Sequence, residues 1–279
     1  MTPDWLGAAR RAAQALGAIL AENPTTAERV VETGERGEGG DRTLEIDAAA
    51  ERAVFAELER LHDDGARFTV VSEERGTVDY GGNGTLVIVD PIDGSMNAKR
   101  GISHHALSIA VAEGPTMADV VFGFVYDLGP GEEWVAERGS GAMLGGARLD
   151  SSIGERRTRD GKLELVGIES ADPRWLRESA DALVETTHRI RAMGTIAVTL
   201  CQVAAARLDG MATLRRARAV DAAAAQLIVR EAGGHVAFTT CEDPLGAPLE
   251  DLSPVSPVVA ARTPEGLREL ARVASTNGD

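Results

Sequence analysis

Residues 86–95 read LVIVDPIDGS, in which a short apolar run ends at Asp90 and is followed by Asp93. A run rich in Val and Ile, bounded by Gly and Asp, predicts a strand. Because Pro91 fixes φ and Gly94 permits a tight turn, both aspartates should converge at the rim of a sheet. Two carboxylates in so small a space repel each other unless a cation or a proton relieves them, and carboxylates with a backbone carbonyl suit a hard cation such as Mg²⁺. The alternative is a plain turn or helix cap, where Asp-Pro and Asp-Gly are common.

Further acidic positions stand at other element boundaries. Glu73 and Glu74 end the apolar run VVSEE, and only one of two neighbours on a strand can face the Asp pair. Asp221 opens a helix of small residues in VDAAAA, and Asp47 opens another helix in LEID. Each has a structural alternative: a solvated strand end for the glutamates, an N-cap for Asp221 and a first-turn acid for Asp47.

The hydrophobic pattern changes along the chain. Apolar residues at helical spacing predict helices over Asp4–Leu20 and Ile46–Leu61. Strands then follow without helices between them, which favours an antiparallel sheet, and they are expected at 68–71, 86–89, 107–112, 120–126 and 134–136. After the polar stretch Leu149–Lys162 the two types alternate, with strands near 163–168, 188–191, 211–214, 235–238 and 258–260 and helices near 173–184, 195–207, 220–231 and from 264. We therefore expect an N-terminal α+β half, residues 1–148, and a C-terminal α/β half, residues 149–279, with the acidic residues at their junction.

Composition and charge narrow the function classes. There are 29 basic and 44 acidic residues, a net charge of −15, so the chain repels phosphate backbones and anionic lipid headgroups at long range. Nucleic acid and a membrane surface are therefore poor candidates as partners. Two cysteines, Cys201 and Cys241, can form neither a disulfide framework nor a zinc site, and no segment has the pattern of a signal peptide or the length of a membrane span. A cytoplasmic protein is the expectation.

The motifs occur together in the order found in a known family. The chain carries GEGGDRT-LEID, VVSEE, VIVDPIDGSMNAKRGI, VVFGFVYDLGPGEEWVAERGSGAML, RAMGTIAV and AVDAAAAQLIVREAGG, in that order. These blocks resemble the inositol monophosphatase-like phosphatases, and the resemblance runs from about Asp4 to about Phe238. GGDRTLEID and RAVD are most similar to the archaeal branch, which includes fructose-1,6-bisphosphatases that also cleave inositol phosphates. The resemblance implies an α+β fold, the layered αβαβα sandwich of the sugar-phosphatase type.

The resemblance also implies a cluster of two or three Mg²⁺ ions. Glu73, Asp90 and the Ile92 carbonyl would hold one ion. Asp90, Asp93 and Asp221 would hold a second, and a third would lie near Glu73. The ions would stabilise the in-line transition state of phosphate ester hydrolysis, and one would supply a water of lowered pKa.

Catalytic and substrate-binding residues follow from the same resemblance. Asp47, Glu73 and Ser95 would be catalytic, with Asp47 and Ser95 orienting or deprotonating the attacking water. Backbone N–H groups of Gly94 and Ser95 would cradle the phosphate. The other substrate contacts implied are Asp93, Gly194, Thr195, Arg218 and Asp221. A small phosphorylated metabolite is therefore the expected partner, and the family leads us to expect a homodimer.

Fructose-1,6-bisphosphate or inositol-1-phosphate is the leading substrate, and two departures from inositol-specific members bear on the choice. Ile196 stands where those enzymes often carry a small Ala, and the stretch Leu214–Arg218 has arginines where they carry a Glu. An Arg there suits a second phosphate better than a hydroxyl, the alternative being surface charge. His104 and His105 either line the pocket or belong to an ordinary turn.

Two other functions stay open. One keeps the chemistry and changes the substrate to a nucleotide phosphate, such as 3′-phosphoadenosine-5′-phosphate or NADP. The other is a non-catalytic, protein-binding regulator, because some bacterial family members bind transcription machinery. That hypothesis predicts a damaged metal set, whereas Asp47 and all four metal carboxylates are present.

Overall fold

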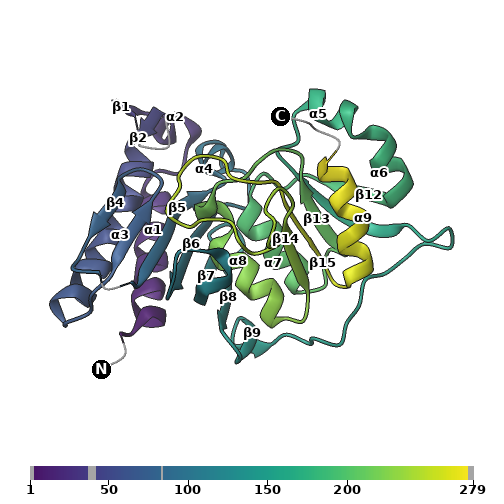
Figure 1. Cartoon of the computed structure of the whole chain (residues 1–279). Helices are drawn as coiled ribbons and strands as arrows, with labels where there is room; N and C mark the ends of the chain where they lie inside the picture. Colours follow the sequence, from purple (N-terminus) through teal and green to yellow (C-terminus); the bar gives the residue numbers. More distant parts are fainter. Residues whose placement is uncertain (1–2, 37–41, 83, 276–279) are drawn as a thin grey trace.

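The computed structural model describes residues 3–36, 42–82 and 84–275 and contains two large β-sheets with helices on both faces of each (Figure 1). Helices α1 (Trp5–Glu22) and α3 (Glu45–Asp63) cover an eight-stranded sheet. Helices α7 (Ile196–Ala204) and α8 (Ala219–Glu231) separate that sheet from a five-stranded one. The outer helices are α5 (Pro173–Glu178), α6 (Ala180–Thr186) and α9 (Pro264–Ser275). This order confirms the predicted αβαβα sandwich.

The eight-stranded sheet has the order β10-β9-β8-β7-β6-β5-β3-β4. Its strands are β3 (Thr69–Ser72), β4 (Gly76–Asp79), β5 (Leu86–Asp93), β6 (Ala106–Ala112), β7 (Val120–Asp127), β8 (Glu132–Glu137), β9 (Gly141–Leu144) and β10 (Ala147–Arg148). The expectation of a wholly antiparallel sheet is wrong at one place, because β3 and β5 run parallel. The hairpin strand β4 returns the chain along the sheet edge before β5 begins. The carboxyl ends of β3 and β5 therefore meet at one edge.

The five-stranded sheet has the order β12-β11-β13-β15-β14. Its strands are β11 (Leu163–Glu169), β12 (Thr187–Arg191), β13 (Gly210–Thr213), β14 (His235–Phe238) and β15 (Val258–Ala261). The first three are parallel to one another, and β15 runs antiparallel to both of its neighbours. Residues 149–162 connect the two sheets, and the division of the chain into two domains there stays a prediction.

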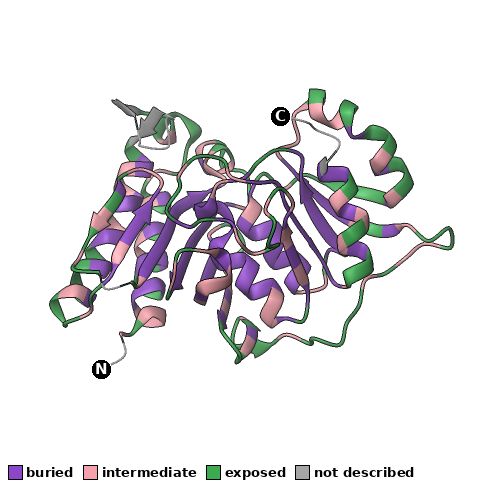
Figure 2. Cartoon of the chain, in the orientation of Figure 1, coloured by how far each residue is buried: buried purple, intermediate pink, exposed green. Residues whose placement is uncertain are grey.

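The elements are buried where the layers face one another (Figure 2), and the buried side chains there form three apolar clusters. Helix α8 is enclosed on all sides, since every residue from Ala219 to Val229 is buried. Its small residues let backbones approach closely: a Cβ on Gly123 of β7 would lie 2.5 Å from the Ala224 carbonyl oxygen. The run of four alanines at 222–225 in α8 therefore lets this helix pass between the two sheets.

Several short elements differ from the prediction. The helix expected over 173–184 is two helices, because the chain breaks at the buried Ser179. The helix expected over 195–207 ends earlier, at Ala204. The elements not predicted are α2 (Thr26–Arg29), β1 (Glu32–Arg36), β2 (Arg42–Leu44), α4 (Ser95–Arg100), the 3₁₀ helix Met117–Asp119, β4, β9 and β10. Of the GEGGDRT block, residues 37–41 lie outside the described residues. None of the described helices has the length and apolarity needed to cross a bilayer.

Candidate active site and metal centre

Three carboxylates converge where β3, β5 and α8 meet. Glu73 directly follows β3, and Asp90 lies beside it on the parallel strand β5, since Ser72 pairs with Val89. Asp221 lies in the first turn of α8, which packs against β5. One oxygen from each of Glu73, Asp90 and Asp221 lies within 4.8 Å of the other two. Three predicted metal ligands from separate parts of the sequence are thus brought together.

Burial and mutual repulsion raise the pKa of the carboxyl groups in and beside this cluster. Burial raises the pKa of Glu73 to about 7, and repulsion by Asp221 adds to the rise. Burial, then the charge of Asp221, raises the pKa of Asp93 to about 8. Burial, then the charge of Glu73, raises the pKa of Asp90 well above its usual range. The pKa of Asp221 is raised by burial in spite of the neighbouring Arg218. Without a cation, the site retains protons near neutral pH.

Arg218 places a positive charge among these acids. Its Nη1 donates to Glu73 Oε1 at 2.5 Å, and its Nη2 donates to Asp221 Oδ1 at 3.2 Å. The residue is also the N-cap of α8, and its backbone N–H donates to Asp221 Oδ2 at 3.3 Å. The sequence predicts Arg218 at a substrate phosphate, whereas here its guanidinium spans two predicted metal ligands.

A small cleft, open to solvent, lies over the cluster. It is lined by Asp47, Glu73, Glu74, Asp90, Pro91, Ile92, Ser95 and Lys99. Asp47 comes from the first turn of α3 and Ser95 from the first turn of α4, so two helices direct predicted catalytic residues into one space. Sequence reasoning missed Lys99, and the signal for it is the i, i+4 spacing from Ser95 in SMNAK.

Glu73 and Glu74 both border this cleft, although only Glu73 belongs to the carboxylate cluster. The expectation that one of the two faces the Asp pair rested on strand alternation. Both residues instead lie in a turn after β3, where side chains do not alternate.

Asp93 connects β5 to the start of α7. Its Oδ2 accepts from Thr195 Oγ1 at 2.5 Å and from the Ala197 N–H at 2.7 Å. The two glycines predicted to contact substrate also meet here: a Cβ on Gly94 would lie 3.0 Å from the Gly194 carbonyl oxygen. The turn before α4 and the turn before α7 therefore pack against each other beside the acid cluster.

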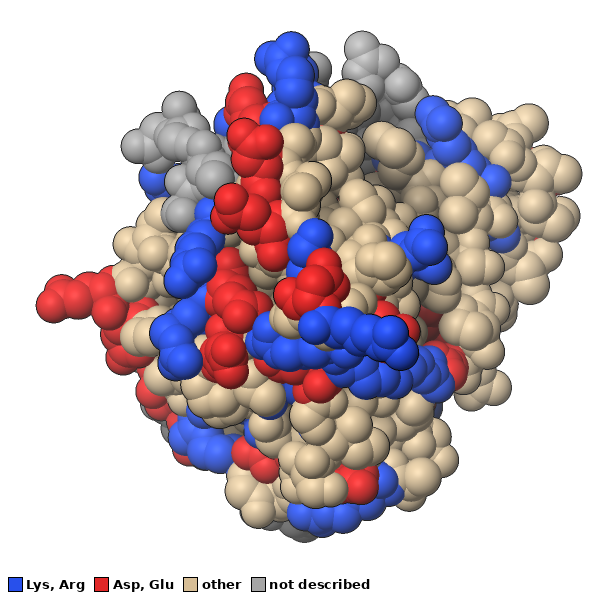
Figure 3. Space-filling model, turned by 90° about the vertical axis from the view of Figure 1, so that its right-hand side faces the viewer, with Lys and Arg blue, Asp and Glu red and all other residues tan. Residues whose placement is uncertain are grey.

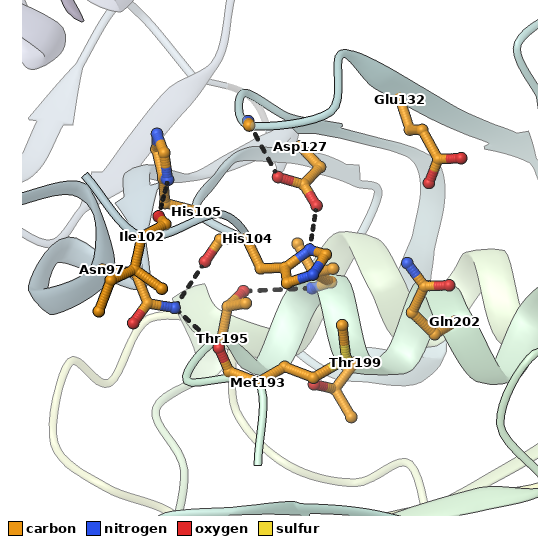
Figure 4. Close-up of polar contacts among 12 residues, drawn as sticks. Asn97, Ile102, His104, His105, Asp127, Glu132, Met193, Thr195, Thr199 and Gln202 are labelled. Atoms are coloured by element: carbon orange, nitrogen blue, oxygen red, sulfur yellow. Dashed lines mark hydrogen bonds and ion pairs between the residues drawn. The ribbon is translucent and has the colours of Figure 1, made fainter. Parts of the chain in front are cut away.

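His104, His105, Arg215 and Arg216 are not among the residues that line the cleft. His104 Nδ1 lies 2.8 Å from Asp127 Oδ2, and His105 Nδ1 lies 3.2 Å from the Ile102 carbonyl oxygen (Figure 4). The Arg215 guanidinium carbon lies 4.4 Å from the centre of the Trp175 ring. On the face seen in Figure 3, basic and acidic side chains are interleaved, so that face is not uniformly basic.

The donor set fits a hard divalent cation. Asp90 Oδ1 accepts the Ile92 N–H at 3.0 Å, while Asp90 Oδ2 is buried and has no hydrogen-bond partner among the described residues. A buried oxygen without a donor is costly unless a cation binds it. Carboxylates are the ligands that Mg²⁺ prefers, so the cluster of Glu73, Asp90 and Asp221 could hold such an ion.

Known proteins share both the sequence pattern and this architecture. Residues 3–277 match the model of the inositol monophosphatase family. The fructose-1,6-bisphosphatase/inositol-1-monophosphatase of Thermococcus kodakarensis is 39% identical over 198 residues, which cover 71% of this chain and 70% of that relative. The Nus factor SuhB of Haemophilus influenzae is 32% identical over 234 residues, which cover 83% of this chain and 84% of that relative.

Solved structures show the same fold. An inositol monophosphatase–fructose 1,6-bisphosphatase superposes with a TM-score of 0.81 at 22% identity, covering 97% of this chain and 99% of that one. The extragenic suppressor protein SuhB of Bartonella henselae superposes with a TM-score of 0.76 at 26% identity, covering 96% of this chain and 97% of that one.

Proposed function

The chain belongs to the inositol monophosphatase family and is a phosphatase, and on that premise we propose that it is a Mg²⁺-dependent phosphomonoesterase of small sugar or polyol phosphates. The observation that carries the proposal is the acid cluster, in which Glu73, Asp90 and Asp221 place one oxygen each within 4.8 Å of the other two. The buried Asp90 Oδ2, which has no partner in the described structure, supports a cation at this point. Metal dependence is also general in the family.

We assign the metal ligands as the resemblance to the family implies them. Glu73, Asp90 and the Ile92 carbonyl would hold one Mg²⁺ ion, and Asp90, Asp93 and Asp221 a second, with a weaker third near Glu73. When bound, the ions supply positive charge that stabilises phosphoryl transfer and lowers the pKa of a water molecule. Two or three ions would also offset the repulsion that raises the pKa values of these carboxyl groups.

The residues around the acids would position the substrate and the water. Asp47 and Ser95 line the same cleft as Glu73, so we assign them to orienting the attacking water and accepting its proton. Gly94 is the N-cap of α4 and offers no side-chain cap, which leaves the first N–H groups of α4 to bind a phosphate oxygen. Lys99 adds a positive charge to the cleft. The anionic substrate would thus be held by an acidic protein.

Fructose-1,6-bisphosphate is our first substrate and inositol-1-phosphate our second. Relatives from Thermococcus kodakarensis and Methanothermobacter thermautotrophicus, at 39% and 33% identity, carry both activities in their names. Arg218 supports a bisphosphate, because cations bound to Glu73 and Asp221 would release its guanidinium toward a second phosphate. Ile196, which follows Thr195 at the start of α7, would narrow the pocket for the sugar.

Phosphate release by the purified chain, with and without Mg²⁺, tests the proposal. The substrates would be fructose-1,6-bisphosphate, inositol-1-phosphate, 3′-phosphoadenosine-5′-phosphate and NADP, each at low and at molar salt. We expect Mg²⁺-dependent release from fructose-1,6-bisphosphate. Release of phosphate from the nucleotides alone would mean that the substrate is a nucleotide phosphate, and the proposed metal-dependent hydrolysis would still hold. Phosphate release at the same rate with and without Mg²⁺ would refute the metal assignment.

A second function, protein binding in transcription, is favoured by one observation: a Nus factor SuhB from Escherichia coli is 32% identical over 243 residues. This function predicts that Asp90→Asn abolishes hydrolysis and leaves binding to transcription proteins intact. If neither the wild type nor Asp90→Asn bound transcription proteins, this second function would be excluded.

We also propose that the chain is a cytoplasmic homodimer. The free thiols Cys201 and Cys241 are consistent with a reducing compartment. Sedimentation analysis at micromolar concentration distinguishes the dimer from a monomer.

A further inference from the structure

Asn97 joins two backbone segments that lie beside the proposed phosphate site. It belongs to α4, the helix that follows Gly94. Its Nδ2 donates to the His104 carbonyl at 2.8 Å and to the Met193 carbonyl at 2.7 Å. The amide therefore uses both hydrogens, one for the loop after α4 and one for the turn before α7 (Figure 4).

The first acceptor lies in a loop that the end of β7 holds in place. His104 has a φ of 68°, a left-handed conformation that is uncommon for a residue with a Cβ. Its Nδ1 lies 2.8 Å from Asp127 Oδ2, and Asp127 is fully buried. The other oxygen of Asp127 accepts the Gly129 N–H at 3.2 Å. The His104 carbonyl is thus a fixed point for the Asn97 amide.

The second acceptor lies in a turn that is anchored from the five-stranded sheet. Glu169, the last residue of β11, is buried, and its two oxygens accept the Met193 N–H at 2.9 Å and the Gly194 N–H at 3.0 Å. Gly194 has a φ of 81°, and a Cβ on it would lie 2.9 Å from Asn97 Nδ2. Only glycine at this position lets Asn97 reach the Met193 carbonyl.

The two turns that Asn97 connects are packed against each other. A Cβ on Gly94 would lie 3.0 Å from the Gly194 carbonyl oxygen and 3.1 Å from the His104 carbonyl oxygen. Thr195, the next residue of the second turn, donates to Asp93 at 2.5 Å. A small change in the distance between the turns would therefore move backbone groups on both sides of the substrate.

We propose that Asn97 is a positioning residue for phosphate ester hydrolysis, whose amide sets the distance between the Gly94–Ser95 turn and the Gly194–Thr195 turn. This inference rests on the proposed function, which assigns both turns to substrate. The amide hydrogens bind carbonyls and not the carboxylates of the metal cluster. Loss of the amide should consequently reduce substrate turnover much more than Mg²⁺ binding, because of the assigned ligands only Asp93 is bonded to the second turn.

The test compares Asn97→Ala with Gln226→Ala. Gln226, which is buried in α8, is a matched control because its Nε2 also donates to two carbonyls, those of Met117 at 3.0 Å and Ala223 at 3.3 Å. We expect Asn97→Ala to lower kcat/KM for fructose-1,6-bisphosphate by about 100-fold, the scale of a reacting group misplaced by about 1 Å. The Kd for Mg²⁺, measured by calorimetry, should change far less than kcat/KM. Gln226→Ala should lose thermal stability and retain kcat/KM.

Hydrogen exchange gives a second readout that does not depend on activity. The Met193 and Gly194 amides should exchange about fivefold faster in Asn97→Ala, the factor that one lost hydrogen bond of ordinary strength gives. Asn97→Gln keeps a donor on a side chain one methylene longer, so it should fold, retain this protection and still lower kcat/KM.

Two results would overturn the inference. One is unchanged exchange at these amides in Asn97→Ala. The other is wild-type kcat/KM in both Asn97 variants. If the wild-type protein released no phosphate from any substrate, the proposed function would fail, and the exchange measurement would still decide whether Asn97 holds the turn.

Discussion

Replacing Asp90 by Asn should stabilise the metal-free protein and abolish its turnover. Asp90 Oδ1 accepts the Ile92 N–H at 3.0 Å, and an amide oxygen can keep that bond. The second oxygen has no hydrogen-bond partner among the described residues, and Asp90 belongs to the cluster with Glu73 and Asp221. The Asp90 carboxylate repels the neighbouring carboxylates, whereas the amide nitrogen of Asn can donate hydrogen bonds to them.

The size of the gain follows from the geometry. Two unit charges 4.8 Å apart repel each other by about 3.5 kcal/mol at an effective dielectric constant of about 20. Protonation and the Arg218 guanidinium already relieve part of this repulsion, so we expect a net gain of about 2 kcal/mol at pH 8. For a chain of 279 residues that corresponds to a rise in Tm of about 3 °C.

Thermal unfolding at pH 8 in the presence of a chelator measures this gain. Asp209→Asn is the control, because Asp209 is also buried but accepts the Arg156 and Leu165 N–H groups, each at 2.8 Å. The control should lower Tm while Asp90→Asn raises it. Added Mg²⁺ should stabilise the wild type more than Asp90→Asn. A lower Tm for Asp90→Asn without Mg²⁺, or wild-type turnover with Mg²⁺, would refute the reasoning.

The metal-free protein should also lose stability as pH rises from about 4 to about 8. Burial raises the pKa of Glu73 to about 7 and of Asp93 to about 8. In this pH range the folded state therefore holds protons that the unfolded chain has released, and the free energy of unfolding falls as those protons are lost. Urea unfolding in chelator at pH 5 and pH 8 checks this, and equal free energies of unfolding would contradict it. Arg218→Gln should destabilise the metal-free protein by about 3 kcal/mol, since the carboxylates of Glu73 and Asp221 lose the guanidinium that pairs with them. In thermal unfolding, added Mg²⁺ should reduce this loss of stability. A loss that Mg²⁺ leaves unchanged would argue against competition between the guanidinium and the metal. Gly123→Ala should cost about 2 kcal/mol in urea unfolding, because its Cβ would lie 2.5 Å from a backbone carbonyl of α8. Gly17→Ala, where a Cβ meets nothing within 4 Å in helix α1, should be neutral or stabilising, and a similar loss in both variants would contradict the packing argument.

Much of the fold could be predicted from the sequence because buried faces impose a period on it. The helix expected over Ile46–Leu61 is found over Glu45–Asp63, and its apolar face packs on the sheet. The strand around Val89 was visible as an unbroken apolar run, since β5 is buried on both faces. Glu73 and Asp90 were visible as acids at the ends of such runs, which is where side chains leave a sheet for a cleft.

The remaining features depend on contacts that are distant in sequence. The parallel pairing of β3 with β5 is decided by the edge strand β4, which is too short to show a period. The helix α4, with six residues, is also too short to show a helical period, so the i, i+4 spacing of Ser95 and Lys99 gains its meaning only once α4 is known to be a helix. The ion pairs of Arg218 with Glu73 and Asp221 require β3 and α8 to be adjacent, which no local pattern reveals.

Helix α8 is enclosed between the two sheets, and this has a consequence for how the protein is made. During synthesis the ribosome releases Glu73 and Asp90 long before Asp221, so a nascent or C-terminally truncated chain carries only part of the acid cluster. Asp221 joins the other acids only where α8 packs against the first sheet. Ion binding would therefore stabilise the completed chain and not its fragments. Cellular Mg²⁺ would in this way favour finished molecules over incomplete ones.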